Sequence, residues 1–88
     1  MPRRWHAPAW FLRDALCLHA HEGAWNANTG NSYYGGLQFL LSTWRRAGGA
    51  GYPHRASPRE QIYRCWLIYL RDGRSFREWG TAGVCGLR

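Results

Sequence analysis

Apolar side chains recur at helical spacing in three stretches of the chain, and this pattern predicts three main helices. The first is expected over residues 8 to 22, because Pro8 suits a first helical turn and Gly23 suits a helix end. Its apolar face comprises Phe11, Leu12, Ala15, Leu16 and Leu18. The second helix is expected to end at Gly48 and Gly49. Its apolar positions are Leu37, Leu40, Leu41 and Trp44.

The third helix carries the clearest start signal in the chain. Ser57 is a predicted N-cap, Pro58 takes the first helical position, and Glu60 completes a capping box. Its predicted buried stripe is Ile62, Cys65, Trp66 and Tyr69, and Gly73 should end it. Ser75 and Glu78 repeat the same capping spacing and predict a short fourth helix that carries Phe76 and Trp79. The tail from Gly80 to Arg88 reads as loop.

Between the first two helices, residues 25–34 are rich in Asn, Thr, Gly, Ser and Tyr, which is typical of a loop or hairpin. Residues 26–31 could form a tight turn between two very short strands. The expected fold is therefore mostly α (α+β): three main helices, a short one, and a small hairpin or loop after the first helix. Residues 1–7 form an expected N-terminal arm, and residues 8–86 form one domain.

Composition narrows the class of protein. The chain has 88 residues, 45% of them hydrophobic, with six Trp, which excludes a disordered chain and allows one domain. The net charge of +7 comes from twelve scattered arginines and suits nucleic acid, an anionic wall polymer or an acidic lipid surface without choosing among them. No apolar run approaches the ~20 residues of a membrane span. The amino terminus is a poor signal peptide, so a trimmed domain or a phage-borne one is expected.

The three cysteines suggest one disulfide and one free thiol in an oxidising compartment. Cys65 lies on the apolar stripe of the third helix and is expected to be the buried free thiol, which leaves Cys17 and Cys85 as the candidate pair. Three free thiols remain an alternative. His19 and His21 are two residues apart and so point to different faces of a helix, which argues against a metal site. No cofactor is expected.

Glu22 is the candidate catalytic residue. It is one of only five acidic residues, and it ends an apolar helix just before a glycine- and tyrosine-rich loop. Apolar surroundings and a helix C-terminus both favour the protonated form that a general acid needs. The alternative is a solvated acid at a helix end. Asp14 should lie about 12 Å away along the helix, too far for a paired mechanism.

The other three acids occupy predicted cap or helix-end positions, where capping or solvation explains them: Glu60, Asp72 and Glu78. A mechanism with one carboxyl group is therefore the more natural interpretation. The acid would protonate the leaving oxygen and then act as base on a nucleophile supplied by the substrate. In peptidoglycan that nucleophile can be the C6 hydroxyl of the muramic residue, which gives a 1,6-anhydro product.

The segment from Cys17 to Gly49 resembles the transglycosylase-like domain of the resuscitation-promoting factors of actinobacteria, and the resemblance extends over residues 8–86. Its most specific part is the run from Asn28 to Phe39, Asn-Thr-Gly-Asn-Ser-Tyr-Tyr-Gly-Gly-Leu-Gln-Phe. Further matches are Glu22, Trp25-Asn26, Ser42-Thr43-Trp44, Gly48-Gly49, Ala56-Ser57, Glu60-Gln61-Ile62 and the segment from Trp79 to Cys85.

The resemblance implies a small, secreted, lysozyme-like domain that cleaves the MurNAc-β-1,4-GlcNAc bond of peptidoglycan, with Glu22 as its single catalytic acid. It also implies a disulfide between Cys17 and Cys85. The glycan-facing residues that it implies are Thr29, Tyr34 and Gln38, with Gln61 and Trp79 on the opposite wall. A monomer acting outside the cell or at the cell wall is expected. Alternatives are lysozyme-type hydrolysis, a wall-binding module with little turnover, and, least favoured, nucleic-acid binding.

Overall fold

The structure is a computed structural model that describes all residues, 1–88. Three α-helices dominate it: α1 (Ala9–Glu22), α2 (Leu41–Arg46) and α3 (Pro58–Arg71). A two-stranded antiparallel sheet, β1 (Tyr33–Tyr34) and β2 (Phe39–Leu40), follows α1. Two short 3-10 helices, η1 (Pro53–Arg55) and η2 (Ala82–Cys85), complete the chain. The mostly helical α+β class expected from the sequence is confirmed.

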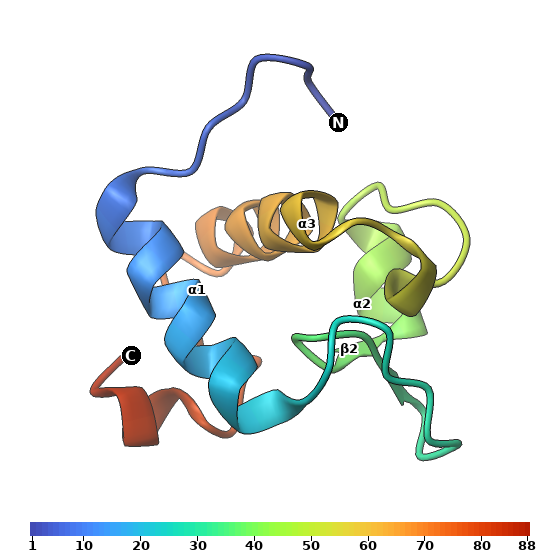
Figure 1. Cartoon of the computed structure of the whole chain (residues 1–88). Helices are drawn as coiled ribbons and strands as arrows, with labels where there is room; N and C mark the ends of the chain where they lie inside the picture. Colours follow the sequence, from blue (N-terminus) through green and yellow to red (C-terminus); the bar gives the residue numbers. More distant parts are fainter.

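Helices α1 and α3 pack against each other and form the frame of the domain (Figure 1). The lower end of α1 lies beside η2 near the carboxyl terminus, and the hairpin lies next to α2. Thirteen hydrophobic residues form one buried cluster between these elements: Phe11, Ala15, Leu18, Leu37, Phe39, Trp44, Ala47, Ile62, Cys65, Ile68, Phe76, Trp79 and Ala82. The core thus joins all three α-helices with β2, η2 and the segment before η2.

The start of α3 follows its local signals. Ser57 Oγ accepts a hydrogen bond from Glu60 N at 3.1 Å, and Pro58 opens the helix. Asp72 is the C-cap, and Gly73 follows with φ = +73°, in the left-handed region that glycine favours. The predicted N-cap and end of this helix are confirmed. Cys65 is the free, buried cysteine expected on this helix, and burial raises the pKa of its thiol.

The predicted start of the second helix is wrong. Helix α2 begins at Leu41, whereas Leu37 is buried in the turn of the hairpin. Gln38 has φ = +50°, and its backbone N–H donates to Gly35 O at 3.2 Å, which closes the turn between β1 and β2. A residue in the left-handed region cannot continue an α-helix, so the apolar spacing over residues 37–40 does not produce one. The hairpin instead pairs Tyr33 with Leu40.

The predicted helix from Ser75 is also wrong. Ser75 Oγ accepts from Arg77 N at 3.1 Å, two residues on, and not from the N–H of Glu78 as in a capping box. The segment forms a turn in which Trp79 N donates to Phe76 O at 2.9 Å. Helical structure appears later, as η2, in the tail that was expected to be loop. On α1 the buried face is narrower than predicted, because Leu12 and Leu16 are exposed.

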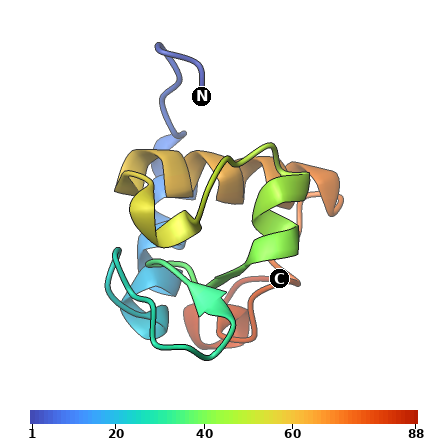
Figure 2. The same cartoon turned by 90° about the vertical axis from the view of Figure 1, so that its right-hand side faces the viewer.

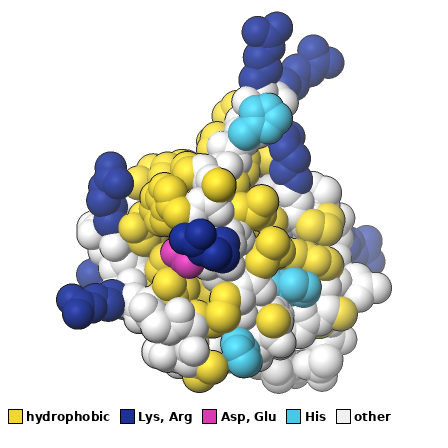
Figure 3. Space-filling view, turned by 60° about the vertical axis from the view of Figure 1, so that its left-hand side comes forward, with side chains coloured by type: hydrophobic (Ala, Val, Ile, Leu, Met, Phe, Trp, Pro, Cys, Tyr) yellow, Lys and Arg dark blue, Asp and Glu magenta, His cyan; other side chains and the backbone are white.

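Residues 1–8 precede α1 and extend beyond the body of the molecule, as Figures 1 and 2 show from two sides. The guanidinium group of Arg59 donates to the carbonyl oxygens of Arg3 and Trp5, and Trp5 packs edge-on against Tyr63 at 5.0 Å between ring centroids. On the face shown in Figure 3, arginine side chains project at separate places between apolar areas and form no continuous basic patch. None of the helices is long and apolar enough to cross a membrane.

Candidate active site

Glu22 is the last residue of α1, and its side chain is half-buried. Thr81 Oγ1 donates a hydrogen bond of 2.5 Å to Glu22 Oε2. This length is typical of a hydroxyl that donates to a carboxylate oxygen. The contact joins residues 59 positions apart, so the carboxyl group is oriented by the far end of the chain.

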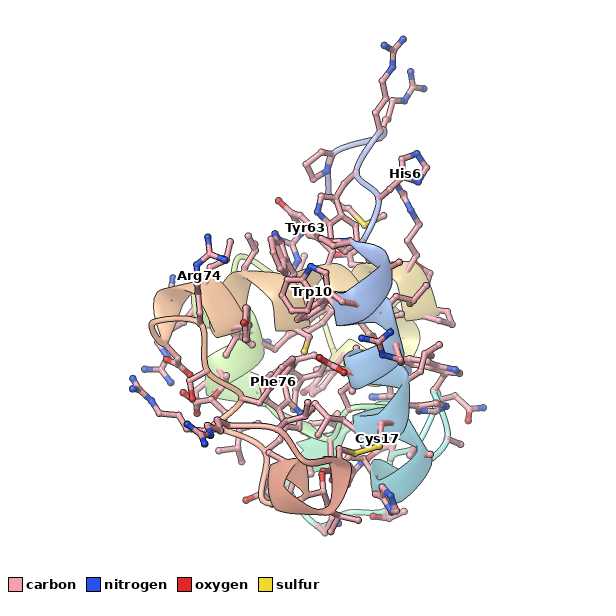
Figure 4. All side chains as sticks on the ribbon, turned by 90° about the vertical axis from the view of Figure 1, so that its left-hand side faces the viewer. His6, Trp10, Cys17, Tyr63, Arg74 and Phe76 are labelled. Carbon is pink, nitrogen blue, oxygen red and sulfur yellow. A yellow bond between two sulfur atoms is a disulfide. The ribbon has the colours of Figure 1, made fainter.

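A disulfide holds the two segments of this contact together. Cys17 lies on α1 five residues before Glu22, and Cys85 lies on η2 four residues after Thr81. Their Cα atoms are 6.0 Å apart, and the bond between the sulfur atoms joins the two elements side by side in Figure 4. The expected Cys17–Cys85 pairing is therefore present. It fixes η2 against the helix that carries Glu22.

Glu22 opens onto a cavity of about 330 Å³. Three segments contribute to its walls: the end of α1, the hairpin, and residues 78–81 before η2. The lining residues are Glu22, Asn31, Tyr33, Gln38, Glu78, Trp79, Gly80 and Thr81. Most of them are polar, which suits a ligand with many hydroxyl groups better than an apolar one.

Two of the residues proposed from the sequence, Gln38 and Trp79, lie in this lining with Glu22. Trp79 is nearly buried, and its indole N–H donates to Leu37 O at 2.9 Å. Gln38 Nε2 donates to Gly35 O at 2.9 Å, which leaves the amide oxygen of Gln38 without a hydrogen bond inside the protein. The wall of the cavity beside the hairpin is thus fixed by backbone contacts and still offers a hydrogen-bond acceptor.

Gln61, which the resemblance placed on the opposite wall, does not line this cavity. Its side chain is fully buried, and its Oε1 accepts from Gly36 N at 2.8 Å. Its Nε2 donates at 3.0 Å to both Trp25 O and Ala56 O. These contacts use the amide to join α3, the hairpin and the loop after α1, because buried backbone groups need partners. Gln61 positions the hairpin and does not reach the cavity.

Thr29 and Tyr34 also lie outside the cavity lining. Thr29 is exposed, and Tyr34 is half-buried with its ring stacked on His54 at 5.6 Å between centroids. The tyrosine in the lining is its neighbour Tyr33. Successive side chains of a strand point to opposite faces, so only one of the two can face the cavity. The sequence motif identified the two adjacent tyrosines but did not show that Tyr33 is the one that lines the cavity.

His19 connects α1 to the hairpin. Its ring stacks on Trp25 at 3.8 Å between centroids, and its Nδ1 lies 2.9 Å from Gly36 O. A Cβ atom at Gly36 would collide with both the Trp25 and His19 side chains, so only glycine permits this approach. Together with Gln61, these contacts hold the hairpin against the end of α1, where the cavity opens.

The sequence analysis assigned no role in the site to five residues of the lining: Asn31, Tyr33, Glu78, Gly80 and Thr81. Thr81 lies in the segment that carried the resemblance, but its sequence gives no sign of the contact with Glu22. Glu78 was assigned to a helix cap, yet it lines the cavity and lies directly before Trp79. A hydrogen bond with Asp72 raises the pKa of Glu78, burial and repulsion by Asp72 act in the same direction, and Arg46 and Arg77 oppose them.

One group of potential metal ligands comes together: Cys17, His21 and Cys85, whose ligand atoms all lie within 4.8 Å of one another. Two of these three atoms are the sulfurs of the disulfide. Cysteine binds metals as the thiolate, so in the oxidised protein only His21 offers a ligand. The arrangement does not provide a metal centre.

The family model and the related proteins that match this chain agree with one another. A family model described as "Transglycosylase-like domain" matches residues 13–82. The chain is 44% identical over 72 residues to resuscitation-promoting factor Rpf of Micrococcus luteus, a match covering 82% of this chain and 30% of that protein. It is 48% identical over 78 residues to RpfC of Mycobacterium tuberculosis (strain Erdman), covering 89% of this chain and 52% of that protein.

A third relative, RpfE of Mycobacterium tuberculosis (strain H37Rv), is 43% identical over 75 residues, covering 85% of this chain and 41% of that protein. The chain thus spans between about a third and a half of the length of these relatives. The matched residues include most of α1, the hairpin and residues 78–81, which close the cavity.

Proposed function

Because the chain belongs to the family of transglycosylase-like domains, we propose that it is a glycosidase that cleaves the glycan strands of peptidoglycan. The proposed bond is the β-1,4 linkage between N-acetylmuramic acid and N-acetylglucosamine. The observation that carries the proposal is Glu22: a half-buried carboxyl group, oriented by Thr81, at the wall of a polar cavity of about 330 Å³.

Glu22 acts first as the general acid. It gives its proton to the glycosidic oxygen, and the bond from that oxygen to C1 of the muramic residue breaks. Glu22 then accepts the proton of the C6 hydroxyl as the C6 oxygen bonds to C1, which gives a 1,6-anhydro end. Thr81 occupies Glu22 Oε2, so Oε1 remains available to face the sugar.

The remaining lining residues supply the contacts to the glycan. Gln38 offers an amide oxygen to sugar hydroxyls, and Trp79 and Tyr33 offer ring surface. We assign no sugar contact to Thr29, Tyr34 or Gln61, since none of them lines the cavity. The scattered arginines would add an attraction to an anionic cell wall, which added salt should weaken. A disulfide is typical of proteins that act outside the cytoplasm, which favours action at the cell wall.

The test is the replacement Glu22→Gln, assayed on purified sacculi by mass spectrometry of the released muropeptides. The protein should release fragments with new 1,6-anhydro ends, and the variant should release almost none. Glu60→Gln is the matched control, because Glu60 pairs with Arg64 on α3 and lies outside the cavity lining. If Glu22→Gln releases fragments at the unchanged rate, Glu22 is not the catalytic acid.

The same assay separates the enzyme from a wall-binding module. A module that only binds the glycan would sediment with sacculi and release no fragments, with or without Glu22. An enzyme whose acid is removed should still sediment with sacculi while release stops. Binding by Glu22→Gln without release therefore distinguishes the two functions in one pair of measurements.

A further inference from the structure

Glu78 lies where three adjoining hollows of the surface meet. The cavity beside Glu22 continues into a hollow of about 70 Å³ that reaches Thr43 at the start of α2. A third hollow, of about 40 Å³, adjoins Thr43 and Asp72. Glu78 is the only residue that lines all three. A glycan strand that runs from Glu22 towards α2 therefore passes the Glu78 carboxyl group.

The position of Glu78 is fixed relative to Glu22. The backbone and indole N–H groups of Trp79, the next residue, donate to Phe76 O and Leu37 O, both at 2.9 Å. Thr81, three residues on, binds Glu22 itself. Glu22 and Glu78 line the same cavity of about 330 Å³, and inverting glycosidases use two carboxyl groups that face a common space holding the attacking water. The cavity thus brings two acids to one space that is open to water.

The surroundings of Glu78 are suited to a base. Asp72 is 8% exposed, and its Oδ1 accepts from Arg77 Nη2 at 3.3 Å. Its Oδ2 is buried and has no donor, which leaves this oxygen for a proton carried by Glu78. The charged groups that face the pair are Arg46 of α2 and Arg77 of its own segment. This contact raises the pKa of Glu78, and a carboxylate with a raised pKa is the stronger base.

We propose that Glu78 is a second catalytic carboxyl group of the cavity, which activates water and directs part of the turnover to hydrolysis. The inference rests on the proposed function and deepens it. In this branch the water oxygen bonds to C1 of the muramic residue while the bond from C1 to the glycosidic oxygen breaks. Glu22 gives its proton to the leaving oxygen, and Glu78 accepts a proton from the water. The product has a reducing end and no anhydro ring.

Two nucleophiles then compete for the same C1 atom. The C6 hydroxyl needs only Glu22 as its base, whereas water needs Glu78. The ratio of reducing to anhydro ends therefore measures the contribution of Glu78 to hydrolysis separately from the contribution of Glu22 to bond cleavage. This ratio is a property that a merely structural role of Glu78 would not change.

The experiment is digestion of sacculi in ¹⁸O-labelled water, with mass spectrometry of new reducing and anhydro ends. Glu78→Gln keeps the size of the side chain and removes the base. Positioned general bases contribute roughly 10²–10⁴-fold, so the ratio of labelled reducing ends to anhydro ends should fall about 100-fold. Glu60→Gln makes the same chemical change outside the cavity lining and should leave the ratio unchanged.

The positioning role of Asp72 is tested by Asp72→Asn, which keeps the Glu78 carboxyl group but removes its charged partner. The reducing-end ratio should fall by a smaller factor than in Glu78→Gln. Thermal unfolding of each variant verifies that the domain is folded. An equal ratio in the protein and in Glu78→Gln overturns the inference, and so does a protein that makes anhydro ends alone. A protein that makes neither kind of end overturns the proposed function and the inference with it.

Discussion

The two carboxyl groups of the cavity are held in opposite ways. Glu22 ends a helix and is oriented by one neutral hydroxyl group, that of Thr81. Glu78 lies on an irregular segment and is surrounded by charged groups, Asp72 and two arginines. The partner of Glu22 is a neutral hydroxyl group, whereas the partners of Glu78 are charged: Asp72 raises its pKa, and Arg46 and Arg77 oppose the rise. The comparison shows that the cavity holds two different acids rather than a symmetric pair.

The largest effect should come from Glu22 itself. Loss of a general acid costs roughly 10²–10⁴-fold in rate, so Glu22→Gln should lower the release of both anhydro and reducing ends by that factor. Turnover on sacculi is the measurement. Because every branch needs the leaving oxygen to be protonated, the ratio of the two ends is not the expected change here. An equally large fall of both ends in Glu78→Gln would erase the difference between the two acids.

Removal of the disulfide should weaken the attachment of η2 to the helix that carries Glu22. Cys17 and Cys85 are 68 residues apart, and a loop of that length contributes about 4 kcal/mol in the chain-entropy model. The double variant Cys17→Ser, Cys85→Ser should lose stability of that order in urea unfolding. Turnover should fall further than folding explains, because η2 no longer fixes Thr81. Cys65→Ala is the control, since Cys65 is a free cysteine and forms no disulfide.

The hydroxyl partner of Glu22 should have a smaller effect. Thr81→Val keeps the shape of the side chain and removes the donor to Glu22 Oε2. A net hydrogen bond contributes about 0.5–1.5 kcal/mol, so kcat should fall roughly 2- to 10-fold with little change in KM. Thr81→Ser restores the hydroxyl group and should restore the rate. A Thr81→Val variant with full activity would mean that the contact does not orient the acid.

The smallest effect concerns pH. Asp72 raises the pKa of Glu78 above its ordinary value of 4.5, so Asp72→Asn should lower that pKa, as measured by NMR titration of the Glu78 carboxyl carbon. The folded state binds this proton more tightly than the unfolded state. Its stabilising contribution is therefore complete below pH 4.5 and is lost as the pH rises through the raised pKa. Glu78→Gln should flatten this part of the dependence of Tm on pH.

Local signals determined the parts of the fold that the sequence predicted well. Ser57, Pro58 and Gly73 act through neighbouring backbone groups, so the limits of α3 could be derived from them. The start of α2 could not, because the apolar positions at residues 37–40 fit a helix until the turn places Gln38 at positive φ. The turn at Ser75 could not be derived from the sequence either, because its hydroxyl oxygen accepts from the nearer N–H of Arg77 and not from that of Glu78.

The residues of the candidate site likewise fall into those that the sequence identified and those that depend on contacts between distant segments. Glu22, Gln38 and Trp79 were identified from the motif and do lie in the cavity lining. Gln61 was identified too, but whether an amide faces a ligand or a backbone depends on what packs around it. Thr81 was missed because its partner lies 59 residues away and no periodicity links them. Contacts of this kind become visible only once the chain is folded.

The attachment of the N-terminal arm determines how the domain can be tethered. Arg59 holds the arm beside α3, and both views place the amino terminus at the opposite end of the molecule from the hairpin and η2 (Figures 1 and 2). A surface anchor, resin or second module joined at Met1 would therefore leave the mouth of the cavity unobstructed. A domain tethered in this way could still bind insoluble peptidoglycan. The length of the linker would then determine how far from the attachment point it can act.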